Sequence, residues 1–311
     1  MNGMNGSFLH KCRYFCYKCL PIKVYLKIFY FVFFKKNLNT QNPKRFSEKI
    51  FCLKIINFKK YGSLLTECYD KYTVRGYIVK KLGKEQAELI LNDLFFVFNT
   101  VDEIDFDKLP DKFVLKITQS SGCNIICPNK SKLDKILTIK KLKEWIEKIN
   151  SLEQLKDAME ESYYFNGKAK IICEKFLESN KGAIPIDFRI YCFNGAPKLI
   201  VCDFGTTEKD GQHGQNIVRN VYDLEWNLLN VNLGRAHDKN IIMSKPKNLE
   251  RMISIARKLS EDFMFVRVDL YDLDDKIVFG ELTPIPMGGH CIITPEKYDL
   301  LLGAWLKIPP L

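Results

Sequence analysis

The chain has 311 residues, of which 46% are hydrophobic, so it can bury a full core and two or three packed subdomains. Its net charge of +11 arises from 48 Lys and Arg against 37 Asp and Glu. Residues 1–47 contain nine of the basic residues and no acid, which leaves the rest of the chain almost neutral. Because the basicity is local and no nucleic-acid-binding motif is present, we do not expect nucleic acid as a partner.

The N-terminal arm, residues 1–41, combines lysines with aromatic residues. Its apolar run 20–34 is shorter than the roughly 20 apolar residues of a membrane span, and it lacks the features of a signal peptide. Lys23 and Lys27 would share one face of a helix. Two interpretations stay open: the helix packs on its own domain, or residues 8–36 rest on anionic lipid. We expect a cytoplasmic protein, with the second interpretation placing it at the inner face of the membrane.

The eleven cysteines are scattered through apolar segments, which favours reduced thiols over a disulfide framework. His10, Cys12, Cys16 and Cys19 are four soft-metal ligand types within ten residues. No second half-site follows at zinc-site spacing, so the sequence leaves open whether this group binds metal.

The remaining chain predicts an α+β protein with antiparallel hairpins. The expected elements, in chain order, are helices over 42–58 and 70–83, a strand and a short helical segment within 87–106, strands over 111–118 and 125–127, a long helix over 130–149, a strand over 169–178, a hairpin over 187–204, a loop over 205–216, a helix over 247–263 and a pair of strands over 267–286. Asn194-Gly195 is a strong hairpin signal. The absence of a βαβ series and of GxGxxG argues against a dinucleotide-binding fold.

Lys116 lies in the middle of an apolar strand, where a buried ammonium group needs an anionic partner. Ser120, Ser121 and Gly122 follow it as a flexible tip whose backbone N–H groups can cover a phosphate. A lysine beside such a loop is typical of nucleoside triphosphate binding, although the P-loop pattern GxxxxGK[ST] is absent.

Two neighbouring strands direct carboxylates towards one place. Alternation puts Arg267 and Asp269 on one face of a strand, and Glu281 and Thr283 on the matching face of the next. One carboxylate from each strand can bind Mg²⁺ through hard oxygen ligands, and Arg267 can neutralise a phosphate. The alternative is a cross-strand ion pair in which Arg267 satisfies both acids.

Seven stretches, in this order, resemble the TupA-like family of the ATP-grasp superfamily, which is linked to teichuronopeptide and surface-polysaccharide synthesis. They are "NPKRFSEKI", "DKYTVRGYI", "LPDKFVLKITQSSGCNIIC", "CEKFLE", "DFRIYCFNGAPKLI", "FVRVDLY" and "FGELTPIPMGG". The resemblance implies an ATP-grasp fold, in which two α+β subdomains grip ATP. The implied divisions are the arm 1–41, an N-terminal subdomain 42–112, a lid 113–172 and a C-terminal subdomain 173–311 with a metal site.

By this resemblance, Lys71 and Lys116 contact ATP, and Asp269 and Glu281 hold magnesium, expected as two ions. Thr283 stands where the family commonly has Asn, and a hydroxyl is a weaker metal ligand than an amide oxygen. Arg189 replaces a lysine of the family, and its planar fork prefers an oxyanion. The implied adenine hinge consists of Glu174, Lys175, Phe176 and Leu177, with Glu178 as a ribose contact.

The resemblance implies an ATP-dependent carboxylate–amine ligase, which phosphorylates a carboxylate and lets an amine attack the acyl phosphate. Arg267 and Arg189 are the expected catalytic residues, since crowded phosphate charge must be neutralised. The expected substrates are a uronic acid or glycan carboxylate of a surface polysaccharide or its precursor, and an amine or amino acid. The alternatives are a kinase or glycan-modifying transferase on the same fold, and a non-catalytic glycan- or membrane-associated protein.

Several residues are candidates for contact with the acceptor substrate. The polar loop 205–219 follows a strand that borders the expected site, and Arg219 is a potential carboxylate partner, although an ordinary solvated loop fits the pattern equally. The other candidates are Asp187, Gly288, Gly289 and His290. For His290, a position on the surface or in a loop without a role in binding is the alternative.

Overall fold

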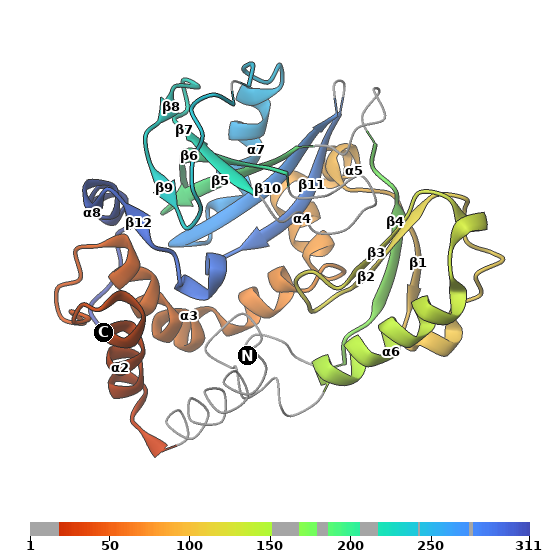
Figure 1. Ribbon diagram of the computed structural model, residues 1–311, viewed down its shortest axis with the longest axis horizontal. Helices are drawn as coiled ribbons and strands as arrows, with labels where there is room; N and C mark the ends of the chain where they lie inside the picture. Colours follow the sequence, from red (N-terminus) through yellow and green to blue (C-terminus); the bar gives the residue numbers. More distant parts are fainter. Residues whose placement is uncertain (1–18, 151–167, 179–185, 206–216, 242, 274–275) are drawn as a thin grey trace.

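The computed structural model describes residues 19–150, 168–178, 186–205, 217–241, 243–273 and 276–311, with the backbone alone for 58–61 (Figure 1). The predictions for His10, Cys12, Cys16 and most of the loop 205–216 therefore lie outside the described residues. The described helices are α2 (Ile22–Phe34), α3 (Phe46–Tyr69), α4 (Val74–Leu82), α5 (Lys84–Ile90), α6 (Lys135–Asn150), α7 (Leu249–Ser260) and α8 (Glu296–Trp305), with 3₁₀ turns η1 (Val101–Glu103), η2 (Lys130–Lys132) and η5 (Pro286–Gly289).

The described strands are β1 (Leu94–Phe98), β2 (Phe113–Ile117), β3 (Asn124–Cys127), β4 (Ile171–Lys175), β5 (Asp187–Phe193), β6 (Ala196–Phe204), β7 (Val218–Tyr222), β8 (Leu228–Leu229), β9 (Asn232–Leu233), β10 (Phe265–Leu273), β11 (Lys276–Thr283) and β12 (Ile293–Thr294). The predicted mixture of helices and antiparallel hairpins is confirmed. Within 87–106 the expected strand is preceded by the end of helix α5, because Ala87 and Ile90 bury one helical face.

The larger sheet is antiparallel and has the strand order β11-β10-β5-β6-β7-β8. The predicted β5–β6 hairpin turns at Asn194 and Gly195, whose φ angles of 47° and 79° suit a two-residue turn. Between β10 and β11 the register shifts next to Asp269, so that Gly280 is an extra residue in β11. A Cβ atom on Gly280 would lie 3.1 Å from the Asp269 carbonyl oxygen, so glycine permits the close approach of the two strands.

Strand alternation divides the side chains of this sheet between two faces. Ile190 and Val268 belong to the face that packs against α7, α4 and α5 in the main core. Tyr191 and Phe265 belong to the opposite face and pack against α3 and α8. The polar residues at odd positions further along β5 and β10 share this second face, which therefore carries the candidate site.

The smaller sheet has the order β1-β4-β2-β3, is antiparallel, and lies beside α6 on the right of Figure 1. Leu142 of α6 is buried with Phe113, Leu115 and Cys173 of the sheet. The β2–β3 hairpin carries the tip predicted to cover phosphate, so we refer to this sheet with α6 as the lid. The lid sheet includes β1, which precedes residue 113 in the chain, and the predicted subdomain boundaries stay predictions.

The arm helix α2 packs onto the protein with one face. Tyr25, Leu26 and Tyr30 are buried against Phe51 and Ile55 of α3, as the packing interpretation predicted. None of the helices in the described ranges combines the length and the apolar character that crossing a bilayer requires. The opposite face of α2 is exposed and is considered below.

The described cysteines are all free thiols, as expected. Burial raises the pKa of Cys52 and of Cys173 to about 12. Such thiols stay protonated at neutral pH and serve as packing groups rather than nucleophiles.

Candidate functional site

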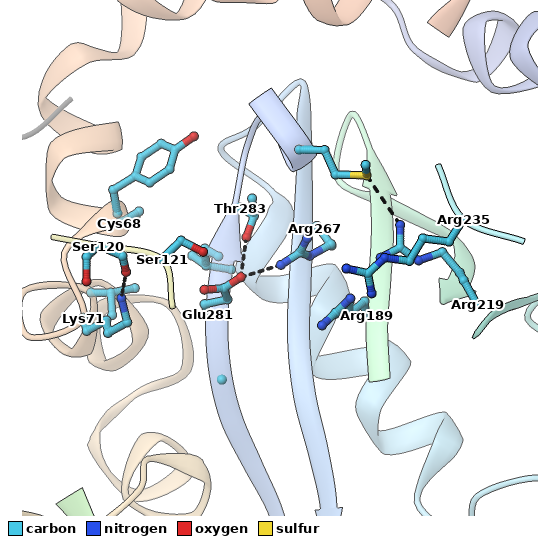
Figure 2. Close-up of a pocket in the computed structure, with 15 residues that line it drawn as sticks. Cys68, Lys71, Ser120, Ser121, Arg189, Arg219, Arg235, Arg267, Glu281 and Thr283 are labelled. Atoms are coloured by element: carbon cyan, nitrogen blue, oxygen red, sulfur yellow. Dashed lines mark hydrogen bonds and ion pairs between the residues drawn. The ribbon is translucent and has the colours of Figure 1, made fainter. Parts of the chain in front are cut away.

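A cavity of about 260 Å³ lies between the larger sheet and the turn that joins α3 to α4 (Figure 2). The α3–α4 turn and the lid tip form one wall, and strands of the larger sheet form the other. The lining residues are Cys68, Tyr69, Lys71, Val74, Ser120, Ser121, Arg189, Arg219, Arg235, Arg267, Gly280, Glu281, Leu282, Thr283 and Met287. Eight residues that the sequence analysis selected from distant segments thus line the same cavity, namely Lys71, Ser120, Ser121, Arg189, Arg219, Arg267, Glu281 and Thr283.

The turn that carries Lys71 is tied to the lid tip. Asp70 accepts hydrogen bonds from the backbone N–H groups of Tyr72 (2.8 Å) and Thr73 (3.1 Å), which fixes the chain at the start of α4. The Lys71 backbone N–H donates to the Thr118 carbonyl at 3.0 Å, and Lys71 Nζ donates to the Ser120 carbonyl. The Lys71 ammonium therefore lies at the lid side of the cavity, facing Glu281 across it (Figure 2).

The predicted pairing of β10 with β11 brings the two carboxylates together. Arg267 Nε donates to Asp269 Oδ1 at 2.7 Å and Arg267 Nη2 donates to Asp269 Oδ2 at 2.6 Å. The same Nη2 donates to Glu281 Oε1, which also accepts from Thr283 Oγ1 at 2.9 Å. These are the contacts of the cross-strand ion pair considered as the alternative, and they also place Asp269, Glu281 and Thr283 where the metal prediction needs them.

Burial acts differently on the carboxyl groups of this site. It raises the pKa of Asp269 well above its usual range despite the charge of Arg267. For Glu281, burial would raise the pKa, but Arg267 and Lys71 lower it below the ordinary value. Burial also raises the pKa of Asp187, which lies on β5 next to β10. Burial therefore outweighs the neighbouring cations in setting the pKa of Asp187 and Asp269, but not that of Glu281.

The residues fit a magnesium ion. In the described ranges no three His, Cys, Asp or Glu side chains gather as a complete metal site. Bound with a nucleotide, however, Mg²⁺ takes only one or two carboxylates, since phosphates and water supply the other ligands. The buried Asp187 Oδ1 has no hydrogen-bond partner in the described structure, and three carboxyl groups there share two guanidinium groups, Arg189 and Arg267. A divalent cation would balance this set of hard oxygen ligands.

Arg219 lies in β7 rather than in the loop before it, and it is almost fully buried. Its Nε and Nη2 donate to Asp203 at 2.6 and 2.7 Å, and its Nη1 donates to the Leu233 carbonyl at 2.9 Å. Arg219 is therefore paired with a carboxylate of the protein itself, and its predicted contact with a carboxylate of the acceptor substrate stays a prediction. The role of the loop 206–216 lies outside the described residues.

Sequence reasoning missed Asp203 and Arg235. Asp203 accepts from Arg219, from Arg235 Nη1 at 2.7 Å and from Arg189 Nη1, with its side chain fully buried. One signal was available, because Asp203 ends the apolar strand "KLIVCDF" at the same face as Arg189. Arg235 follows β9 in an irregular segment, and no periodic pattern marks it.

Lys116 lies outside the lining of the cavity. Its Nζ donates to Glu174 Oε2 on β4 at 2.7 Å, and Arg75 Nη1 lies 3.6 Å from Glu174 Oε1. The anionic partner that a lysine in an apolar strand requires is thus supplied by Glu174. The pair links the predicted ATP lysine to the first residue of the predicted adenine hinge.

In the rest of the predicted hinge, Lys175 is the last residue of β4, and Phe176 and Leu177 follow the strand. The Lys175 backbone N–H donates to the Asp93 carbonyl and the Lys175 carbonyl accepts from Asn92 Nδ2, both at 2.9 Å. Phe176 and Leu177 are half-buried. Glu178 is exposed and pairs with Lys112 at 2.8 Å on the lid surface.

The remaining candidates do not line the cavity. Gly122 is exposed at the lid tip with a φ of 77°. Gly288 and Gly289 are buried in η5. The His290 ring packs against Phe29 and Phe33 of α2, with ring centroids 5.2 and 4.9 Å apart, so it lies under the arm helix.

The sequence model of the family described as "TupA-like ATPgrasp" matches residues 52–307. The chain belongs to the TupA-like ATP-grasp family. The predicted resemblance is therefore confirmed, and the α+β architecture is that of an ATP-grasp protein. No curated protein gives a significant sequence match.

Solved structures similar to the TupA-like chain include ATP-grasp ligases. D-alanine–D-alanine ligase from Bacillus anthracis complexed with ATP is 14% identical, with a TM-score of 0.41, and the match covers 70% of this chain and 56% of that one. The Helicobacter pylori D-alanine–D-alanine ligase is 13% identical, with a TM-score of 0.42 and coverage of 79% and 60%. The ligase PsnB with its minimal precursor, Mg and ADP is 10% identical, with a TM-score of 0.38 and coverage of 77% and 59%. The chain spans less than two thirds of the length of these proteins, and no substrate is transferred from them.

Proposed function

We propose that this protein is an ATP-dependent carboxylate–amine ligase that works through an acyl phosphate. One observation carries the proposal: Lys71 and the lid-tip serines face Arg267, Glu281 and Thr283 across a single cavity. A lysine, a covering loop and paired carboxylates are the groups that ATP with magnesium requires. Membership of an ATP-grasp family supports ATP as the nucleotide.

Each part of the chain has a distinct task in this proposal. Lys71 and Lys116 balance the phosphate charge, while backbone groups from Glu174 to Leu177 receive adenine. Asp269 and Glu281, assisted by Thr283, would hold magnesium, which we propose as two ions that neutralise phosphate charge. Glu174 positions Lys116, because their ion pair of 2.7 Å fixes the ammonium on the inner side of the lid.

The two arginines of the neighbouring strands act on the reacting groups. Arg267 and Arg189 stabilise the negative charge that accumulates as the terminal phosphoryl group moves from ATP to the substrate carboxylate. An amine then attacks the acyl carbon, a C–N bond forms, and phosphate leaves with the C–O bonding electrons. Closure of the lid would exclude water from the acyl phosphate during these steps.

For the substrates we propose a uronic acid or glycan carboxylate of a surface polysaccharide and an amine or amino acid. Membership of the TupA-like family supports this choice. The test is ADP release by the full chain with Mg·ATP and a matrix of uronic acids and amines. ADP release that requires both an acid and an amine supports the ligase, while release with a glycan hydroxyl acceptor and no amine identifies a kinase. Nucleotide binding without turnover by any pair would favour a non-catalytic role.

We also propose that α2 contacts an anionic membrane surface. Its outer face exposes Val24, Ile28 and Phe31, of which Phe31 is 51% exposed, at the spacing of one helical stripe. Lys23 and Lys27 flank this stripe and form no ion pair with the described residues. Apolar side chains flanked by lysines favour anionic lipid, whereas a second copy of the helix would bring lysine against lysine.

A further inference from the structure

Three arginines lie together at the end of the cavity away from Lys71 (Figure 2), and all three pair with one buried carboxylate. Asp203 Oδ2 accepts from Arg219 Nη2 at 2.7 Å, from Arg235 Nη1 at 2.7 Å and from Arg189 Nη1. The Asp203 side chain is fully buried, so it is a fixed anchor rather than a solvated counter-ion. We call Asp203, Arg189, Arg219 and Arg235 the arginine cluster.

The arginines of the cluster differ in the donors that remain. Arg219 uses four of its five N–H groups, which donate to Asp203, to the Leu233 carbonyl and to Met287 Sδ. Arg235 uses only Nη1, and its Nε and Nη2 have no acceptor in the described residues. Arg189 uses Nε and Nη1, which leaves Nη2 without an acceptor there. Donors that line a cavity and have no acceptor among the described residues are available to a ligand.

Charge points to the class of ligand. The three guanidinium groups are opposed by Asp203 and, through Arg189, by Asp187 and Asp269. Arg189 is shared with the carboxyl groups of β5 and β10, whereas Arg219 and Arg235 are paired with Asp203 alone among the described residues, so two positive charges face one carboxylate and the pair attracts an anion. Arginine presents a planar fork that matches a carboxylate or a phosphate.

The position of the cluster separates it from the reacting group. A carboxylate that receives a phosphoryl group has to lie beside the nucleotide phosphates, next to Arg267 and Glu281. Arg235 lies on the far side of Arg189 from those residues, as Figure 2 shows. An anion bound by Arg235 is thus a second anionic group, one that is recognised but does not react.

We propose that Arg235 and Arg189 form a subsite for a second carboxylate or phosphate on one of the two co-substrates. This proposal rests on the proposed function for the existence of those co-substrates. It restricts their chemistry: either the amine belongs to an amino acid whose own carboxylate docks here, or the acid carries a further anionic group. A neutral amine paired with a simple monocarboxylic sugar would leave the subsite empty.

The test is calorimetric titration of the full chain with inorganic phosphate, D-glucuronate and L-glutamate. Each probe is measured with and without saturating Mg²⁺ and a non-hydrolysable ATP analogue. The variants are Arg235→Gln and Arg235→Lys, and Arg251→Gln on the exposed face of α7 is the control with the same change in charge. Arg235 is 31% exposed, and Asp203 also pairs with Arg189 and Arg219. Substitution of Arg235 therefore leaves the buried carboxylate with two partners.

We expect at least one probe to bind the wild type and to bind Arg235→Gln about tenfold to a hundredfold more weakly, as the loss of a charged hydrogen bond predicts. Arg235→Lys should lie between these two, and Arg251→Gln should match the wild type. A preference for glutamate assigns the anion to the amine, while glucuronate or phosphate assigns it to the acid or glycan. Equal affinity in Arg235→Gln, or no binding of any probe to the wild type, would overturn the subsite.

The titrations with the ATP analogue allow the subsite and the proposed function to be tested separately. Failure of the ATP analogue to bind would count against the ligase, while the titrations without nucleotide would still decide the subsite. Conversely, normal binding of the analogue by Arg235→Gln, with the anion lost, would confirm the subsite as distinct from the nucleotide site.

Discussion

Replacing Asp203 with asparagine should strongly destabilise the fold. The substitution preserves shape but removes the fully buried carboxylate that pairs with all three of Arg189, Arg219 and Arg235. Breaking a buried ion pair by removing one partner costs about 3–5 kcal/mol, because the other charge is left uncompensated. We therefore expect the free energy of unfolding, measured by urea titration at pH 7 with tryptophan fluorescence, to fall by about that amount.

The matched control is Glu178→Gln, which makes the same change of charge in an exposed ion pair. Glu178 and Lys112 lie 2.8 Å apart with side chains 44% and 52% exposed, so their pair should contribute about 1 kcal/mol or less. If Asp203→Asn were no more destabilised than Glu178→Gln, the arginine cluster would not depend on the buried charge. Asp203 would then not be the fixed carboxylate that holds Arg189 and Arg235 in place for an anion.

Three further predictions concern other parts of the molecule. Burial alone would raise the pKa of Asp203, but the three arginines lower it below its ordinary value. The stabilising charge of Asp203 is therefore fully present above about pH 3.9 and is lost as the pH falls further. The difference in unfolding free energy between wild type and Asp203→Asn should shrink as urea titrations are moved from pH 5 to pH 2. Ile28→Ser should reduce co-sedimentation with vesicles that contain phosphatidylserine by several-fold, because it removes an exposed apolar side chain from α2. Gly280→Ala should destabilise the fold by about 1–3 kcal/mol in urea titration, since its Cβ would lie 3.1 Å from the Asp269 carbonyl oxygen.

Each of these has its own control. A pH-independent difference between wild type and Asp203→Asn would mean that Asp203 does not titrate as described. Ile136→Ser, on the exposed face of α6, changes the same side chain away from α2 and should leave vesicle binding intact; equal losses in both variants would exclude a specific membrane face. An unchanged stability of Gly280→Ala, compared with Gly62→Ala where the added Cβ meets nothing within 4 Å, would show that the β10–β11 bulge tolerates a side chain.

Local rules in the sequence predicted the parts of the site that lie within one hairpin. Asn194-Gly195 fixed the β5–β6 turn, and period-two alternation put Arg267 and Asp269 opposite Glu281 and Thr283, as the paired strands show. These relations depend on neighbours in sequence, where turn chemistry and strand geometry decide the outcome. The family resemblance added Lys71 as an ATP contact, and the structure places it on the same cavity as the lid tip.

The rest depends on contacts between distant segments. Asp203, Arg219 and Arg235 come from β6, β7 and the segment after β9, and only the folded sheet brings their side chains together. Lys116 pairs with Glu174 because β2 and β4 are neighbours, although 58 residues separate them in the chain. His290 lies under α2 because three aromatic residues of α2 and α3 surround it, which no motif near "MGGH" indicates.

The central claim is that Lys71, Asp269 and Glu281 hold ATP with magnesium. It is tested most directly by calorimetric titration of the folded wild type with ATP, in Mg²⁺ and in EDTA, alongside Asp269→Asn and Glu281→Gln. We predict binding that requires Mg²⁺ and that is weakened at least tenfold in both variants. Absence of ATP binding by the folded wild type in Mg²⁺, or equal binding by both variants, would contradict the account.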